Sequence, residues 1–323
     1  MRAQLRPVLP VLVVLIAVLL PLDQVAASFP GPNGRIAYDV DNSSRYFGEV
    51  MQVNSFQLGK RPFDERVVYH CVNGSSGGVP IRAGSPPCVG GGDPAYASDG
   101  RRLAFVQGGG VGYDLSGPKP RGPLAIANDD GSGFQSLPQL TEEDGQPAWS
   151  PRGTSLVFRG KSGSSYDLYI VRTDGSGLRR VTDDPVTDSD PVWRGRRIAF
   201  ARGGNLFLVR PDGAGLRRLT RRGGAEPAWA PDGSRIAFTR RGDVYVMRAD
   251  GSRLRRLTRK GGVTPVWSPD GKLLLFHRPG ASSGRSGVYV MRSSGRSMRL
   301  LLDDSPDVEA YRRIWDFDWG RHP

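Results

Sequence analysis

The chain has 323 residues and a formal net charge of +13, with 45 Lys and Arg against 32 Asp and Glu. Its 44 Gly and 26 Pro are more turn formers than a helical bundle or a coiled coil would tolerate. At 38% hydrophobic residues, the composition excludes a protein with many membrane spans but allows a hydrophobic core. These numbers favour a β-rich protein and do not by themselves indicate an activity.

The first 27 residues have the pattern of a signal peptide. A basic start precedes an apolar run from Val8 to Leu22, and the small residues at 25–27 suit cleavage before Ser28. The run is shorter than the stretch of about 20 residues that a membrane-spanning helix needs. We therefore expect export, one mature domain over residues 28–323 and no stable membrane span after cleavage. An uncleaved anchor is the alternative.

The chain has two cysteines, Cys71 and Cys88, separated by 16 residues rich in Gly, Ser and Pro. In an oxidising compartment, such a pair is expected to form one disulfide that closes a loop. A metal site or a reactive thiol is the alternative. With His70 as the one histidine nearby, the ligands are too few for a zinc site. We expect a structural disulfide.

One sequence block recurs five times along the chain. Each copy starts with Pro-x-aromatic, passes through a turn that contains Gly, and ends in an apolar run that finishes with Phe. The copies are residues 94–105, 147–158, 191–200, 227–238 and 265–276. Because Gly supplies the positive φ of a tight turn and the apolar run alternates large and small residues, each block predicts a β-hairpin.

A second hairpin follows most blocks. Runs of aromatic and β-branched residues, such as Asp243 to Met247, lead through a Gly-containing turn into a short Leu-Arg-Arg segment. Four short strands that recur about every 40 residues predict the blades of a β-propeller. An aromatic residue at a shared strand position, such as Trp149, is expected to pack between blades.

The two ends of the chain complete the count. Residues 315–319 match a first strand, Asn33 to Tyr38 match a second strand, and residues 48–53 match a third. We therefore predict an all-β fold with six blades of four antiparallel strands. The ring would be closed by N- and C-terminal strands that share the last blade.

The combined pattern resembles the TolB-type propeller repeat, also called PD40 or WD40-like. The residues that carry the resemblance are Trp-Ser-Pro-Asp-Gly, Ile-Ala-Phe, Val-Tyr-Val-Met and Leu-Arg-Arg-Leu-Thr, best seen at 227–258 and 265–292. The resemblance covers about residues 29–320 and implies a propeller fold. Relatives with this repeat include a periplasmic scaffold that binds proteins at the outer membrane, propellers that gate peptidase domains, and sugar-acid lyases.

A polar, often acidic, residue precedes the Pro of each block. We expect the repeat to bring these residues to one mouth of a central channel, where Asp93, Asp190, Glu226 and Asp316 form a candidate ligand site. A ring of carboxylates could hold a divalent cation or a basic group of a ligand. The alternative is that these side chains solvate the mouth or bond to backbone between blades. No cofactor is otherwise indicated.

Paired arginines recur on the expected outer strands and form a candidate basic rim. The pairs are Arg179 and Arg180, Arg217 and Arg218, and Arg255 and Arg256. Successive strand residues point to opposite faces, so a pair cannot form one patch by itself. We expect the charges to protect exposed strand edges. The alternative is a surface that meets an anionic polymer or a membrane. Nucleic acid is not the expected partner, because no RNA-stacking motif is present.

Three segments depart from the repeat: residues 56–93, 107–123 and 185–190. Variable loops on a rigid scaffold commonly carry recognition, so specificity is expected there. Residues 74–78 and 280–284 match Gly-x-Ser-x-Gly but lie in Gly/Ser-rich stretches, without the strand and helix that a hydrolase elbow requires. We therefore expect no catalytic residues.

The expected function is that of a secreted or periplasmic, monomeric scaffold of the cell envelope that binds a protein or another ligand. A polysaccharide-active lyase or hydrolase is one alternative. A binder of anionic wall polymer, acting through the basic rim, is another.

Overall fold

The computed structural model describes residues 33–42, 47–54, 65–69, 91–107, 112–114, 117–119, 122–128, 132–279, 286–303 and 312–321. All of them belong to the compact unit Gly31–Pro323. Within these ranges no helix has the length and apolar character needed to cross a bilayer. The expected signal peptide, the pair Cys71 and Cys88, and the segments 74–78 and 280–284 lie outside the described residues.

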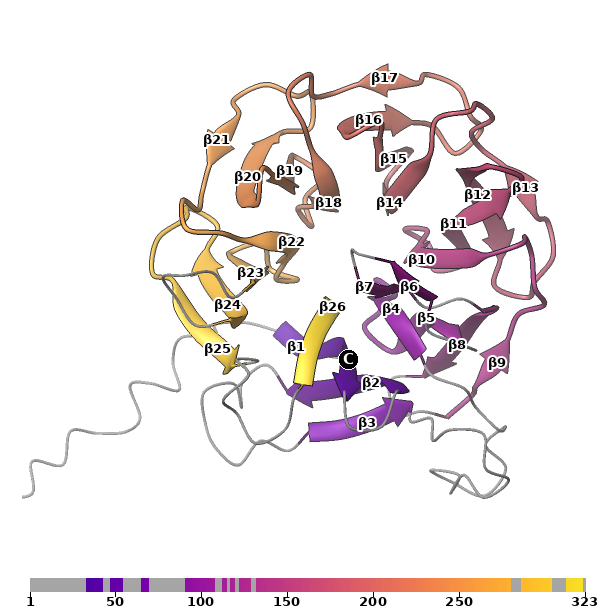
Figure 1. Cartoon of the computed structure of the whole chain (residues 1–323), viewed down its shortest axis with the longest axis horizontal. Coiled ribbons are helices and arrows are strands. Elements are labelled where there is room, and N and C mark those ends of the chain that lie inside the picture. Colours follow the sequence, from indigo (N-terminus) through magenta and orange to yellow (C-terminus); the bar gives the residue numbers. More distant parts are fainter. Residues whose placement is uncertain are drawn as a thin grey trace, which may run out of the picture. The chain divides into compact units, whose positions relative to one another are not determined.

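Five antiparallel blades are built from successive strands, with the first strand innermost and the fourth outermost (Figure 1). The first blade contains β4 (Gly91–Tyr96), β5 (Arg102–Gln107), β8 (Leu124–Asn128) and β9 (Gln135–Ser136). The second contains β10 (Asp144–Trp149), β11 (Ser155–Ser162), β12 (Ser165–Arg172) and β13 (Arg179–Arg180). The prediction of four-stranded propeller blades is therefore confirmed.

The next three blades repeat this order. They are β14 (Asp188–Arg194), β15 (Arg197–Arg202), β16 (Asn205–Val209), β17 (Arg217–Arg218); β18 (Ala225–Trp229), β19 (Arg235–Arg240), β20 (Asp243–Arg248), β21 (Arg255–Arg256); and β22 (Val263–Trp267), β23 (Leu273–Arg278), β24 (Gly287–Arg292), β25 (Arg299–Asp303). The paired arginines form the outermost strands β13, β17 and β21, as predicted. A small hairpin of β6 (Gly112–Asp114) and β7 (Gly117–Lys119) lies within the segment expected to be a loop at 107–123.

A further four-stranded sheet joins the two ends of the described chain in the order β26-β1-β2-β3. Its strands are β1 (Asn33–Asn42), β2 (Phe47–Asn54), β3 (Glu65–Tyr69) and β26 (Arg312–Arg321). β26 runs antiparallel to β1 and also contacts β4 and β22, the inner strands of the first and fifth blades. β3 falls within the insertion expected at 56–93, where the sequence predicts no strand.

The core lies between the sheets. The Phe that ends each repeated apolar run is fully buried, and these residues are Phe105, Phe158, Phe200, Phe238 and Phe276. In four blades this Phe packs on an aromatic residue of the third strand, as Phe158 does on Tyr169 with ring centroids 5.7 Å apart. Burial of one such side chain contributes about 1.5–3 kcal/mol, so the repeated Phe is a main source of stability.

The repeated tryptophans connect neighbouring blades. The indole N–H of Trp149 donates to the carbonyl of Ala95, 2.9 Å away in the preceding blade. The indoles of Trp229 and Trp267 make the equivalent bonds to Val192 and Ala228. Trp149 and Trp267 belong to buried clusters that span two blades, which confirms the expected packing role.

Removal of residues 315–323 is expected to cost a large part of the typical stability of about 5–15 kcal/mol, because β1 would lose its partner on one edge. A cooperative melting transition followed by circular dichroism measures this loss. Deletion of residues 322 and 323 alone, which leaves β26 intact, is the control. An unchanged transition in the longer deletion would contradict this account of β26.

Candidate functional site

The residue before the Pro of each inner strand has a left-handed backbone. Asp93, Gln146, Asp190, Glu226 and Thr264 have φ between 48° and 53°, although none is glycine. Each lies at a bulge, where the pairing register with the second strand shifts. Such a conformation costs of order 1–3 kcal/mol for a non-glycine residue and persists only where its surroundings hold it.

These five residues are linked from blade to blade by hydrogen bonds. The backbone N–H of Gln146 donates to Asp93 Oδ2 at 2.9 Å, and that of Asp190 donates to Gln146 Oε1 at 2.9 Å. The N–H of Glu226 donates to Asp190 Oδ2 at 3.2 Å, and that of Thr264 donates to Glu226 Oε2 at 2.7 Å. In each case the side chain of one blade accepts a backbone N–H from the next, so the series acts as an inter-blade clamp.

The structure therefore brings three of the four candidate ligand residues, Asp93, Asp190 and Glu226, into one series. Their carboxylates bond to backbone between blades, which is the alternative interpretation considered for them. Asp316 lies at the equivalent bulge of β26, between residues 314 and 317. Among the residues that the structure describes, no group of three or more His, Cys, Asp or Glu is placed to hold a metal ion.

The carboxyl of Glu226 lies in a desolvated part of the clamp. Burial raises the pKa of its carboxyl above the ordinary value of 4.5, and the nearby Asp190 carboxylate raises it further. Hydrogen bonds from the Thr239 hydroxyl at 2.5 Å and the Thr264 N–H oppose this rise in pKa. The carboxyl thus serves mainly as an acceptor, a role that Gln146 performs without charge in another blade.

Glu226→Gln should keep both accepted bonds and remove the partly buried charge. Because the folded pKa of Glu226 is raised, its contribution to stability is present at pH below 4.5 and is lost as pH rises through the folded pKa. The variant should therefore gain stability relative to the wild type over this pH range. Urea unfolding from pH 4 to 8 measures the difference. Glu226→Ala, which leaves the Thr264 N–H without its acceptor, should instead lose about 1–3 kcal/mol.

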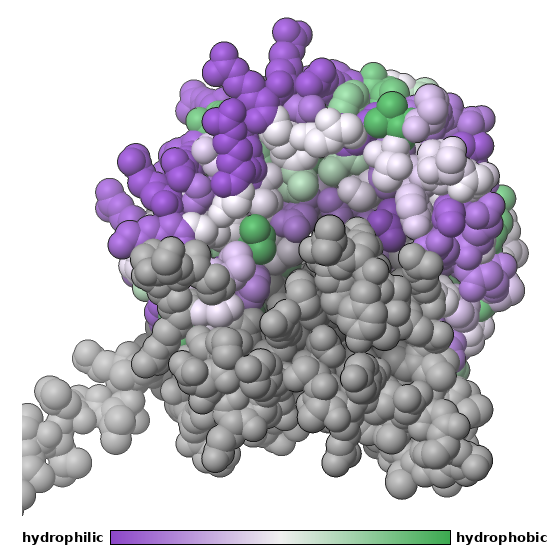
Figure 2. All heavy atoms as spheres, in the orientation of Figure 1, coloured by the Kyte–Doolittle hydropathy of each residue, from purple (hydrophilic) through white to green (hydrophobic). Residues whose placement is uncertain are grey.

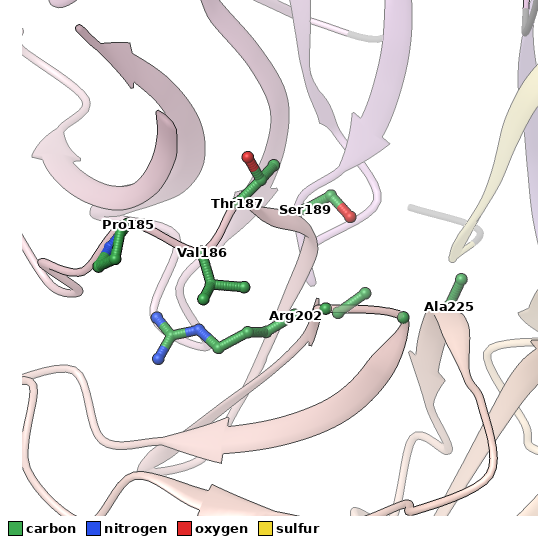
Figure 3. A pocket seen from close by; sticks show the side chains of 9 residues that line it. Pro185, Val186, Thr187, Ser189, Arg202 and Ala225 are labelled. Atoms are coloured by element: carbon green, nitrogen blue, oxygen red, sulfur yellow. The ribbon is translucent and has the colours of Figure 1, made fainter. Parts of the chain in front are cut away.

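A groove lies beside the segment 185–190, one of the three departures from the repeat. It has a volume of about 580 Å³ and is lined by Pro185, Val186, Thr187, Ser189, Ala201, Arg202, Gly203, Gly204 and Ala225. Figure 3 shows the side chains of Val186 and Arg202 near each other along it. Val186 is an aliphatic side chain with 43% of its surface exposed. The groove thus combines an exposed apolar contact with polar backbone and hydroxyl groups.

Arg202 holds the wall of this groove in place. Its Nε and Nη2 contact the buried Asp188 carboxylate at 2.6 and 2.7 Å, and its Nη1 contacts Asp184 at 2.5 Å. The Thr182 hydroxyl also donates to Asp188 at 2.6 Å, and the Val186 N–H donates to Asp184 at 3.0 Å. A bidentate Arg–carboxylate pair has a fixed geometry, so the loop is rigid where it borders the groove.

Asp188→Ala should destabilise the protein by about 3 kcal/mol, because it leaves the Arg202 guanidinium buried without its main partner. The double variant Asp188→Ala with Arg202→Met should recover part of this loss. Asp212→Ala is the matched control, since its pair with Arg210 is exposed and should contribute about 0–1 kcal/mol. Equal effects of the two single variants in chemical denaturation would contradict the assigned role of Asp188.

The six arginines of the basic rim fall into two sets. Arg180 contacts the buried Asp167 at 2.6 Å, and Arg256 forms an ion pair with the buried Asp243. Arg218, whose blade has Asn205 at this position, donates instead to the carbonyl of Thr220. All six arginines are exposed, and Arg217 and Arg255 donate to the backbone carbonyls of Asp250 and Ser293 in the next blade. Three of the six predicted rim residues, Arg180, Arg218 and Arg256, therefore make contacts within their own blades.

These Asp–Arg pairs were not predicted from the sequence. The available signal was an Asp at the start of the third strand followed 13 residues later by the second Arg of the pair, as in Asp167 and Arg180. In the fourth blade, the carboxylate of Asp243 accepts a second hydrogen bond. The donor is the hydroxyl of Thr258, two residues after Arg256, at 3.1 Å. The recurrence of this spacing in two blades would have indicated a structural contact.

No protein-family model matches the sequence. An "Uncharacterized peptidase YuxL" of Bacillus subtilis (strain 168) is 30% identical over 102 residues, which is 31% of this chain and 15% of the relative. A Tol-Pal system protein TolB of Anaeromyxobacter dehalogenans (strain 2CP-C) is 40% identical over 45 residues, 14% of this chain and 10% of the relative. The chain thus matches a small part of the length of these curated relatives.

Solved structures match over most of the chain. TolB from Acinetobacter baumannii has a TM-score of 0.66 and 18% identity, covering 92% of this chain and 69% of that one. A putative TolB from Agrobacterium tumefaciens has a TM-score of 0.58 and 17% identity, covering 91% and 100%. An oligogalacturonate lyase in complex with manganese has a TM-score of 0.54 and 12% identity, covering 85% and 83%. The fold is that of a TolB-like β-propeller, as the sequence predicted.

Proposed function

We propose that this chain is an exported, non-catalytic β-propeller that binds a protein partner in the cell envelope. The TolB-like fold supports this proposal, and so do the curated relatives named as Tol-Pal system proteins. The signal-peptide pattern of residues 1–27 supports export. A disulfide between Cys71 and Cys88 would be consistent with that compartment.

The observation that carries the proposal is the groove beside residues 185–190. The loop departs from the repeat, is held by Arg202, and exposes Val186. A rigid scaffold with one exposed aliphatic side chain beside polar groups has the character of a protein-binding hot spot. The inner polar residues, by contrast, accept the hydrogen bonds of the inter-blade clamp.

We further propose that the sheet β26-β1-β2-β3 is the sixth blade and closes the ring within a single domain over residues 28–323. Its strand order and its contacts with β4 and β22 support this closure. A closed ring leaves no open blade face and suits a rigid scaffold.

Photo-crosslinking of the full chain tests the proposed function. A benzophenone side chain at Val186 should capture one envelope protein, whereas the same group at Leu216, an aliphatic residue with 48% exposure on another part of the surface, should not. Affinity of the purified partner should then fall about tenfold for Val186→Asp and remain unchanged for Leu216→Asp. Equal capture or equal loss at both positions would contradict the assignment of the groove. Turnover of an envelope polysaccharide by the full chain would instead favour the catalytic alternative.

A further inference from the structure

Three neighbouring blades end their second strand with an arginine, at Arg202, Arg240 and Arg278. In the first of these blades, Arg202 is paired with Asp188, the first residue of the inner strand β14. In the other two blades that position is occupied by a glycine, Gly224 or Gly262, immediately before the inner strand. The same arginine position therefore has a carboxylate partner in one blade and lacks that carboxylate in the next two.

The two later arginines have donors that remain unused. The Nε atoms of Arg240 and Arg278 are buried, and neither has a hydrogen-bond partner among the described residues. The Nη2 atom of Arg278 contacts the sulfur of Met298 at 2.9 Å. A thioether sulfur is only a weak hydrogen-bond acceptor. Buried guanidinium donors are normally paired, and no carboxylate forms an ion pair with Arg240 or Arg278 among the described residues, so both keep an uncompensated positive charge.

Aromatic rings hold both guanidinium groups in place. Arg240 Cζ lies 5.4 Å from the ring centre of Tyr245, and Arg278 Cζ lies 4.4 Å from that of Tyr289. A guanidinium stacked on a ring is restrained in its orientation. Both side chains are therefore positioned before any ligand arrives.

The loops around these two arginines are basic. Arg221, Arg222, Arg241, Arg259 and Lys260 are exposed, and no ion pair involves them among the described residues. Together with Arg240 and Arg278 they form seven cationic side chains, which we call the cationic patch. Hydrophilic side chains project over the part of the ring that holds β17 to β21 (Figure 2).

Close contacts join the loops of the patch. The Cγ of Arg240 lies 3.7 Å from the position that a Cβ on Gly223 would take, which places its stem against the loop of Arg221 and Arg222. The N–H of Gly262 donates to the carbonyl of Gly242 at 2.8 Å, which ties the loop of Arg259 and Lys260 to the turn of Arg240 and Arg241. The cations of two neighbouring blades therefore belong to one continuous surface.

We propose that the cationic patch binds a ligand that carries several phosphate groups. The planar guanidinium group of arginine can donate two parallel hydrogen bonds to the oxygens of one phosphate. A phosphate group also carries more negative charge than a carboxylate. The repetition of the arrangement in two adjacent blades suits a ligand with at least two phosphates. This site goes beyond the proposed protein-binding function and does not depend on it.

The test uses the full chain and two variants with equal loss of charge. In the patch variant, Arg221, Arg222, Arg241 and Lys260 are changed to Gln; all four are exposed, so the fold should be retained. In the control variant, Arg172, Arg196, Arg248 and Arg292 are changed to Gln; they are exposed at the opposite ends of the strands. Linear polyphosphate and phosphatidylglycerol vesicles are the two probes, which distinguish a soluble polymer from a lipid surface.

The wild type should bind at least one probe, and added salt should weaken that binding. The patch variant should bind about tenfold or more weakly, and the control variant should stay within about threefold of the wild type. Arg240→Gln and Arg278→Gln, tested singly, should each weaken binding while circular dichroism reports the native strand content. Equal weakening in the patch and control variants, or no binding of either probe by the wild type, would overturn the proposal.

Discussion

The hydrogen bond from the backbone of one inner strand to the side chain of the preceding blade is the constraint on which this propeller depends. Strands of different blades do not pair with one another, so the inner edge of each blade carries backbone donors that need other acceptors. The bulge and left-handed backbone at residues such as Gln146 turn one N–H towards the neighbouring blade. A side chain with an oxygen acceptor at the same position of that blade then satisfies it.

This arrangement explains why the position before the repeated Pro is polar without being uniform. Asp, Gln and Glu all supply an oxygen acceptor that reaches the next blade, and charge is not required, as Gln146 shows. The tryptophan bonds to Ala95, Val192 and Ala228 add a second connection between the same strands. Three residues of the candidate ligand site, Asp93, Asp190 and Glu226, thus also bond one blade to the next.

The arginine that ends the second strand has different roles in different blades. Arg202 is nearly buried and is neutralised by Asp188 and Asp184, so it shapes the wall of the groove. Arg240 and Arg278 occupy the same strand position beside glycine-containing loops and keep free donors among the described contacts. A change of loop sequence between blades thus converts a structural ion pair into a cationic surface.

The repeat made much of the fold predictable, because hairpin turns and alternating strands leave a local signal in sequence. The outer arginine strands and the packing of Trp149 and Trp267 followed from that register. β3 was missed because Glu65–Tyr69 lacks the Leu-Arg-Arg signature and lies within a long irregular insertion. The left-handed backbone at Asp190 and the pairing of Arg180 with Asp167 depend on contacts across strands and blades, which no local pattern specifies.

Hydrogen exchange at the backbone amides of Gln146, Asp190, Glu226 and Thr264 tests the central claim most directly. The account predicts that these four amides exchange as slowly as the buried strand amides around Phe200 and Phe238, because each is bonded to a neighbouring blade and opens only when the blades separate. Rapid exchange at these amides, while the strands within each blade remain protected, would contradict it.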